Sequence, residues 1–429
     1  MNKLTLFAAS AILVLGCAKN VIVSQPITVS FPEPANEITK VDLDETQKGY
    51  VEAGNTMAFR FLQQVYAQED LVLSPLSLQF ALAMTANGAS KGTLAEILDF
   101  LGYGREGIDV LNAYCKKLME QLPAVDLQVK LRLTDAILVN VEYPLLPSFQ
   151  QNVQKNYYAA VENMDFSNHN QVAANINEWA SRSTDGFIDK VLEPDDITDD
   201  AAAFLMNALY FKAKWAGSDF SPMFRERDTV EDKFTRADGS VKQVKYMRKT
   251  SYLRYAEMDG YRVLALPYAG GKFFMYILLP DGNDLDGLVK KLPQISWSSI
   301  LASFQQDAEV ELKLPRFDIE NKVYLTDPLQ EMGVKKAFKP GVAEFDHLFQ
   351  PIDNSYFWIE KVIQKARISV AEWGTEAAAV TVVEVDGKNA VGPGEEPKKV
   401  IFHADHPFLF VLGEATSGTI LFEGAFTGR

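Results

Sequence analysis

An uninterrupted stretch from about Thr46 to Arg429 is the feature that most constrains what this chain can fold into. It contains no second linker, no internal repeat and no block of like charges, so we treat it as one cooperative unit. With 47% hydrophobic and 23% charged residues, the chain has an ordinary globular composition and enough apolar residues for a large core. The sequence therefore predicts a single large domain over residues 46–429.

The charge and the chemically reactive side chains exclude several functions. The net charge is −15, and no long Lys/Arg block offsets it, which argues against binding of nucleic-acid phosphates. Cys17 and Cys115 are too few for a disulfide framework or a Cys-rich zinc site, and only four histidines are present. We therefore expect no metal, no cofactor and no nucleic-acid partner. The apolar neighbours of Cys115 predict an inert cysteine in the core.

Residues 1–16 have the pattern of an export signal. Lys3 precedes an apolar run over 4–15, which is shorter than the roughly 20 residues that a membrane-spanning helix needs. The run closes on a Gly-Cys pair that resembles a bacterial lipobox, in which Cys17 would receive diacylglycerol. The sequence thus predicts an exported, membrane-anchored bacterial lipoprotein, periplasmic or on the cell surface. The alternative is an ordinary secretory signal in which Cys17 is incidental.

The next segment, residues 17–45, has the composition of a linker. Pro26, Pro32 and Pro34 lie among Ser, Thr, Asn and acidic residues. Such a composition is typical of extended chain without packed secondary structure. We expect a flexible tether that carries the lipidated Cys17 and separates the folded body from the membrane.

Within the body, the early segments are mainly helical and the later ones are strand-like. A capping box of Thr93 and Glu96 begins one helix, and Gly102 ends it. The apolar periodicities predict helices over 58–68, 76–87 and 93–101, and antiparallel hairpins pairing 263–266 with 272–279 and 408–412 with 419–422. The sequence therefore predicts a mixed α+β fold.

One short motif suggests an enzyme but stands in the wrong context. Residues 88–92 match the GxSxG pattern in which a hydrolase nucleophile, here Ser90, follows a strand. A helical pattern precedes this motif, and the sequence supplies no histidine partner for it. A lipid-anchored hydrolase therefore remains a competing hypothesis that rests on Ser90 alone, and we expect the chain not to be an enzyme.

The most informative segment is 372–388. Positions 375, 377, 379, 381, 383 and 385 are all uncharged, whereas the charges at 376, 384 and 386 fall on the other face of an extended chain. Gly374 can act as a hinge, and the small side chains that follow would slide between existing strands with little steric resistance. The pattern favours a strand that can be buried on one face. A helix start at 375–379 followed by a surface loop fits the periodicity about equally well.

The residues after this segment have the composition of an exposed loop. Residues 388–397 are rich in Gly, Pro and charge, and the segment begins with Lys388. A trypsin-like protease reads a basic side chain through a carboxylate in its primary pocket. If this loop is extended and exposed, we therefore expect a trypsin-like protease to recognise Lys388 and cleave the chain after it.

Several separated segments of the sequence resemble a known family, the serpins, and the resemblance covers essentially the whole body. Residues 372–381 resemble the hinge of an inhibitory serpin's reactive-centre loop, 74–77 with 87–89 resemble the shutter helix, and 207–215 resemble the central strand that carries the shutter Asn and the breach Trp. The resemblance implies a serpin fold, with helices packed on a large central β-sheet, smaller antiparallel sheets and an exposed reactive-centre loop at about 372–398. It assigns the shutter and breach to Ser74, Ser77, Asn207 and Trp215, and the hinge to Glu372, Gly374, Thr375, Glu376, Ala377, Ala378, Ala379 and Thr381.

The resemblance also implies a function, that of a monomeric suicide-substrate protease inhibitor. A target protease would cleave the loop and form an acyl-enzyme, and the loop would then insert into the main sheet and distort the protease. Family spacing puts the reactive bond at Lys388-Asn389, which favours trypsin-like serine proteases. The loop is longer than usual, so bonds after Val383 or Val385 and elastase-like enzymes are alternatives, as are cysteine proteases.

Two departures from the family pattern support a second hypothesis. Trp373 replaces the usual charged residue after the hinge Glu, and Gln364 stands where many serpins carry a shutter His. These departures favour the alternative of a non-inhibitory serpin-fold binding protein or chaperone.

Overall fold

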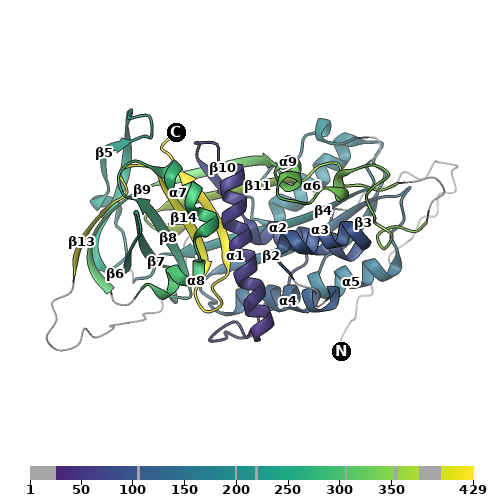
Figure 1. Ribbon diagram of the computed structural model, residues 1–429, viewed down its shortest axis with the longest axis horizontal. Helices are drawn as coiled ribbons and strands as arrows, with labels where there is room; N and C mark the ends of the chain where they lie inside the picture. The colour runs from purple at the N-terminus through teal and green to yellow at the C-terminus, as the bar shows by residue number, and fades with distance from the viewer. Residues whose placement is uncertain are drawn as a thin grey trace, which may run out of the picture.

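Two β-sheets with helices around and between them make up the molecule (Figure 1). The computed structural model describes residues 26–103, 107–198, 201–217, 221–304, 307–351, 356–375 and 398–429. The nine-stranded sheet has the order β1-β15-β14-β8-β7-β6-β9-β13, with β5 paired to β6. The six-stranded sheet has the order β10-β11-β12-β4-β2-β3. The expected mixed α+β architecture is therefore observed.

The helices and strands have the following bounds. The helices are α1 Glu45–Val65, α2 Pro75–Gly88, α3 Lys91–Leu101, α4 Ile108–Gln121, α5 Pro147–Tyr157, α6 His169–Ser183, α7 Leu285–Lys291, α8 Trp297–Ala302 and α9 Thr326–Glu331. The strands are β1 Leu71–Leu73, β2 Lys130–Asn140, β3 Ala160–Met164, β4 Ala203–Lys214, β5 Val230–Thr235, β6 Val241–Met258, β7 Tyr261–Pro267, β8 Phe273–Pro280, β9 Asp307–Pro315, β10 Phe317–Tyr324, β11 Ile363–Ala371, β12 Gly374–Thr375, β13 Lys399–His403, β14 Phe408–Glu414 and β15 Ile420–Phe426.

Helix α2 is the central element of the core. Every residue of α2 except Ala81 is buried, which is typical of a helix that is apolar on all sides. It packs against β4 of one sheet and β15 of the other, so it joins the two sheets. In Figure 1, α1 crosses the long axis of the molecule, with most of the nine-stranded sheet on one side of it and β2, β3 and β4 on the other.

The hairpins predicted from the sequence are present, but two helix starts differ from prediction. Strands β7 and β8 pair antiparallel, as do β14 and β15. Helix α1 begins thirteen positions before 58, where Asp44 and Gln47 form a capping box. Helix α3 begins at Lys91, and the N–H groups of Gly92 and Thr93 in its first turn donate to the Glu344 carboxylate. The predicted capping box is absent, because the Glu96 carboxylate accepts from two backbone N–H groups at 335–336. Gly102 has a φ of +69° and ends α3 as predicted.

The described part of the predicted tether, residues 26–44, packs against the body. Ile27 is 1% exposed and lies in an apolar cluster with residues of α6, β2 and β3, and the guanidinium of Arg132 stacks over the Phe31 ring at 5.1 Å. Val41 and Leu43 join the main core. The expectation of a flexible tether is therefore wrong for these residues, because their aliphatic side chains find apolar surface on the domain. None of the helices within the described residues is long and apolar enough to cross a membrane.

The burial of Ile27 generates a prediction about stability. Ile27→Ala would leave a cavity in the apolar cluster and lower the free energy of unfolding by about 2 kcal/mol. Urea unfolding followed by circular dichroism measures this change. The exposed Asn36→Ala in the same segment serves as control and would change the value by less than about 0.5 kcal/mol. Equal stability of the two variants would contradict the packing of this segment.

Candidate functional site

A cleft separates β4 from β11 in the six-stranded sheet. Among the residues that the structure describes, these two strands are joined only at one end, through the two residues of β12. Beyond that point, and within the described part of the chain, residues 203–212 pair on one side only, with β2, and residues 363–369 pair on one side only, with β10. A cavity of about 290 Å³ lies between them. The sheet therefore holds an opening bordered by two strand edges.

The cleft is lined mainly by apolar side chains on both of its sides. On the inner side, α2 contributes Leu78 and Leu82, and the segment 345–349 contributes its phenylalanines. On the outer side, α6 contributes Ile176 and Trp179. An added strand in this opening would thus find apolar surface on both of its faces.

Strand β12 already occupies one end of the cleft, which we call the upper end. Thr375 is paired with Ala213 of β4 and with Val370 of β11, antiparallel to both. Gly374 has a φ of +135°, and a Cβ atom there would lie 1.9 Å from the carbonyl oxygen of Ala213. Only glycine fits this close approach of three backbones, which is the hinge position predicted from the sequence.

A stacked aromatic pair closes the same end of the cleft. Thr375 is 3% exposed, and its hydroxyl is hydrogen-bonded to that of Tyr268. The Tyr268 ring stacks on Trp215 with a centroid distance of 4.5 Å. The Trp215 indole Nε1 donates to the carbonyl of Ala371 over 2.8 Å. Trp215 therefore links the ends of β4 and β11, as its predicted position at the breach requires.

Glu372 is held in place before the hinge, whereas Trp373 is exposed. The Glu372 side chain is 3% exposed; its carboxylate accepts from Arg316 Nε at 2.7 Å and from the Thr229 hydroxyl. Trp373 is 57% exposed, and its carbonyl accepts from the Trp215 backbone N–H at 3.3 Å. The ion pair fixes the chain just before it enters the sheet.

A row of polar side chains crosses the inner face of the sheet at the middle of the cleft. From β11, Gln364 accepts a hydrogen bond from the Ser74 N–H at 3.0 Å and donates to the Ser74 carbonyl at 2.8 Å. From β4, Asn207 accepts from the Ser77 hydroxyl and donates to Asp135 of β2 at 2.8 Å. The start of α2 thus bonds both edges of the cleft at one level.

Asp135 is the titratable member of this row. It is fully buried, its Oδ1 accepts from Asn207, and its Oδ2 accepts no hydrogen bond from the described residues. Burial raises the pKa of Asp135 to about 7, while the hydrogen bond from Asn207 acts in the opposite direction. The carboxyl therefore changes charge near neutral pH inside the sheet.

The structure brings many of the predicted site residues together. The residues predicted for the shutter and breach line the inner face and upper end of the cleft, Gly374 and Thr375 enter it, and Glu372 lies just before it. The remaining predicted residues lie outside the described residues, namely Cys17, Glu376, Ala377, Ala378, Ala379, Thr381, Lys388 and Asn389. The expected exposed loop at 376–397 lies outside them as well.

Three residues of the site were not predicted from the sequence: Asp135, Tyr268 and Arg316. A lone acidic residue within the apolar run 131–139 was an available signal for Asp135. Tyr268 and Arg316 gave no such signal, because their roles depend on segments distant in the sequence.

The motif around Ser90 has a structural role. Ser90 is the N-cap residue of α3, and its hydroxyl donates to the Asp346 carboxylate at 2.7 Å. A helix, α2, precedes it where a nucleophile elbow requires a strand. Cys115 is 2% exposed, and burial raises the pKa of its thiol, as expected for an inert core cysteine.

Comparison with known proteins identifies the family of this arrangement. A family model described as serpin (serine protease inhibitor) matches residues 52–428. An uncharacterized serpin-like protein of Thermococcus kodakarensis is 33% identical over 391 residues, covering 90% of this chain and 88% of the relative. The crystal structure of the thermophilic serpin tengpin in the native state superposes with a TM-score of 0.76 at 27% identity, over 92% of this chain and 98% of that chain.

A further solved structure has the same fold. Human thyroxine-binding globulin is 24% identical, with a TM-score of 0.76 over 89% of this chain and 98% of that chain. The expected fold, helices packed on a large sheet with further strands, is therefore confirmed.

The raised pKa of Asp135 generates a prediction about pH. The folded state holds the proton more tightly than the unfolded state, so this group stabilises the fold fully below about pH 4 and loses that contribution as the pH rises through about 7. Asp135→Asn removes the titration, so the unfolding free energy of the variant relative to wild type should rise between pH 5 and 8. Urea unfolding at several pH values measures this. A constant difference across the range would contradict the prediction.

Proposed function

The chain belongs to the serpin family, and from this premise we propose that it is a suicide-substrate inhibitor that traps serine proteases. The family has inhibitory members and some non-inhibitory ones, such as thyroxine-binding globulin. The observation that carries the proposal is the open cleft between β4 and β11, into which the residues before the reactive loop already lead. In this proposal the cleaved loop fills that cleft as a new strand.

The register of β12 supports the proposed insertion. Thr375 lies opposite Ala213 and Val370, so the same register, continued in the cleaved form, would bring Thr381 opposite Asn207 and Gln364. Every second residue would then meet the inner face, against Phe211 and Ile368 for Ala377, and against Leu209 and Ala366 for Ala379. The uncharged positions of the segment would thus all face the core, and the charged ones the outer side.

The polar row would give the Thr381 side chain hydrogen-bond partners at its position in the inserted strand. The Asn207 and Gln364 side chains both bond α2 from opposite edges of the cleft. A threonine hydroxyl between them can donate and accept at once. Insertion would therefore complete a buried polar row as well as two ladders of backbone hydrogen bonds.

The chemical step is acyl transfer to the protease. The protease's serine oxygen bonds to the carbonyl carbon of Lys388, and the amine of Asn389 leaves with the serine's proton. Insertion then separates the two ends of the cut and carries the acylated protease away before water hydrolyses the ester. Lys388 favours trypsin-like proteases, with elastase-like and cysteine proteases as further candidates.

The competing function is that of a non-inhibitory binding protein or chaperone. The specific observation in its favour is the exposed Trp373 at the mouth of the cleft, where most of a large apolar ring meets solvent. A binding protein would keep its melting temperature after cleavage of the loop, whereas an inhibitor would gain markedly in thermal stability.

The decisive experiment is a pair of matched substitutions. Wild type mixed with trypsin should form a covalent complex on a denaturing gel. Ala377→Arg should convert the inhibitor into a substrate, because insertion would bury its charge on the inner face at a cost of several kcal/mol. Thr375 is not used for this test because it is already paired and buried in β12 before cleavage. Glu376→Arg places the same side chain one residue earlier, on the opposite face, and should keep most of the inhibition.

Two outcomes would contradict the proposal. If wild type forms no covalent complex with any member of a serine protease panel, the chain is not an inhibitor of this kind. If Ala377→Arg inhibits as well as Glu376→Arg does, inhibition occurs without burial of this face.

We also propose that the protein is exported and anchored to a membrane through lipid on Cys17. The support is the sequence of residues 1–17 alone. Cys17→Ala should move the protein from the membrane fraction to the soluble fraction of the cells that express it, and mass spectrometry of the wild type should find a diacylglyceryl group on residue 17. A soluble wild type without this modification would contradict the proposal.

A further inference from the structure

Strand β15 carries an acidic side chain in the middle of the core. Glu423 is 0% exposed. Neither of its carboxyl oxygens has a hydrogen-bond partner within the part of the chain that the structure describes. A buried carboxyl without partners is far more costly in its ionised form than in its neutral form. The place of Glu423 in the fold therefore depends on its protonation.

Apolar side chains surround Glu423 within the sheet. It is paired with Leu73 of β1 and with Val411 of β14, so these three side chains stand side by side on one face. Leu421 and Ala425 lie on the same face of β15, two positions away on either side. All four neighbours are buried. These described strands therefore give Glu423 neither a side-chain donor nor a counter-ion.

The elements that pack most closely against β15 bring no charge to Glu423 either. These elements are β14, β1, α2 and α1. Over their described lengths, β1 and α2 contain no titratable residue, and β14 contains only Glu414. On α1, the buried Tyr50 packs against two other tyrosines, and the charged residues are all exposed or partly exposed, namely Glu45, Lys48, Glu52 and Arg60. Burial alone raises the pKa of Glu423 well above its usual range.

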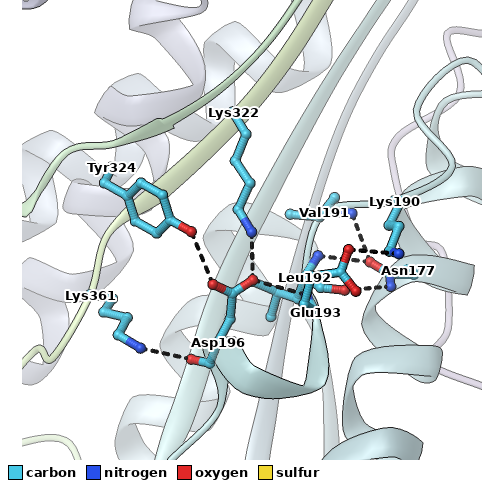
Figure 2. Close-up of polar contacts among 9 residues, drawn as sticks. All are labelled: Asn177, Lys190, Val191, Leu192, Glu193, Asp196, Lys322, Tyr324 and Lys361. Atoms are coloured by element: carbon cyan, nitrogen blue, oxygen red, sulfur yellow. Dashed lines mark hydrogen bonds and ion pairs between the residues drawn. The ribbon is translucent and has the colours of Figure 1, made fainter.

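Two other shielded carboxylates show what Glu423 lacks. Glu414, one strand away and 1% exposed, accepts from two backbone N–H groups, at 2.6 and 2.8 Å, and from one hydroxyl of the turn that follows it. The Asp196 carboxylate accepts from Lys322 and from the Tyr324 hydroxyl (Figure 2). Hydrogen bonds of this kind favour the charged form of a carboxyl. Glu423 receives none from the described residues, so its surroundings suit only the neutral acid.

Strand β15 also holds the start of α2. The Ser74 hydroxyl donates to the Leu421 carbonyl of β15 at 2.9 Å. The backbone N–H and carbonyl of Ser74 are bonded in turn by the Gln364 side chain of β11. A β15 that loosens would therefore free the first turn of α2 and, with it, one edge of the cleft.

We propose that Glu423 makes the packing of β15 proton-dependent, because the strand fits between β1 and β14 only while this carboxyl is neutral. Ionisation of Glu423 must then be accompanied by movement of β15 away from its apolar neighbours, and the contact with Ser74 loosens with it. This inference concerns the uncleaved fold and goes beyond the proposed inhibition, on which it does not depend.

Folding and proton binding are linked at this residue. The folded state holds the proton of Glu423 more tightly than the unfolded chain does. The group therefore stabilises the fold fully below about pH 4.5, and this contribution falls as the pH rises toward the pKa of the folded state. Across that range, each pH unit lowers the folding equilibrium constant by up to about tenfold.

The test measures urea unfolding of the full chain between pH 5 and 9. All proteins carry Asp135→Asn, which removes the titration of the other buried acid, and this single variant is the parent. Glu423→Gln keeps the shape of the neutral acid and has no proton to lose. Glu423→Met places an apolar side chain of similar length there and serves as a second variant should the glutamine fold poorly. Glu414→Gln is the matched control, because it also removes a buried glutamate, one strand away.

The expected result is a pH-dependent gain in stability at Glu423 alone. Relative to the parent, the folding constant of Glu423→Gln should rise by up to about tenfold per pH unit above about pH 5. Glu423→Met should exceed the parent at every pH, because an unpartnered polar group is removed. Glu414→Gln should keep the slope of the parent. Hydrogen exchange, corrected for the intrinsic rate, should show residues 420–426 and 71–79 losing protection with rising pH in the parent and not in Glu423→Gln.

Three results would overturn the inference. If the curves of Glu423→Gln and its parent run parallel from pH 5 to 9, Glu423 is not held neutral. If Glu414→Gln changes the slope equally, the effect does not belong to Glu423. If the curves diverge but exchange at 420–426 and 71–79 stays the same at every pH, Glu423 does not govern the packing of β15. The proposed inhibition stands in each of these cases, because it is tested by the covalent complex with a protease.

Discussion

The structure depends on two strand edges that are held apart within one sheet. Strands β4 and β11 run in the same direction, and a single strand antiparallel to both, begun by β12, would pair with each of them. Backbone groups along such buried edges are costly without partners, and the apolar layers on both sides add to the free energy that filling the cleft would release. In the proposed mechanism, the fold therefore keeps a favourable interaction unmade until the loop is cut, and its persistence is a matter of kinetics.

The contacts that hold the edges apart lie on both faces of the sheet. On the inner face, the start of α2 bonds β4 through Ser77 and β11 through Ser74. On the outer face, Asn177 and Asp196 bond the α6–β4 connection to α6 and to β10. At the upper end, Trp215 joins the two strands directly. Each of these contacts joins segments that are distant in the sequence, and in the proposed mechanism an added strand must fit between the elements that they hold.

The sequence could predict those features whose determining contacts join residues close together in the sequence. The hairpins and the stop at Gly102 depend on neighbouring residues, and the structure has both. The capping box at the start of α3 was predicted wrongly because Glu96 bonds a segment more than two hundred residues away. The contacts of Asp135 and Asp196 could not be predicted, because their partners lie on other strands. The burial of Ile27 could not be predicted either, because it packs on a surface that exists only after folding.

The position of β15 has a consequence for how the protein is made. This strand lies between β1 and β14, and Leu71 pairs with Ala425 across most of the chain. The Ser74 hydroxyl at the start of α2 donates to the Leu421 carbonyl of the same strand. A ribosome must therefore release residues 420–426 before the helix that joins the two sheets gains its last neighbour. Native packing around the core helix thus waits for a partner 347 residues further along the chain, a long-range contact of the kind that slows folding.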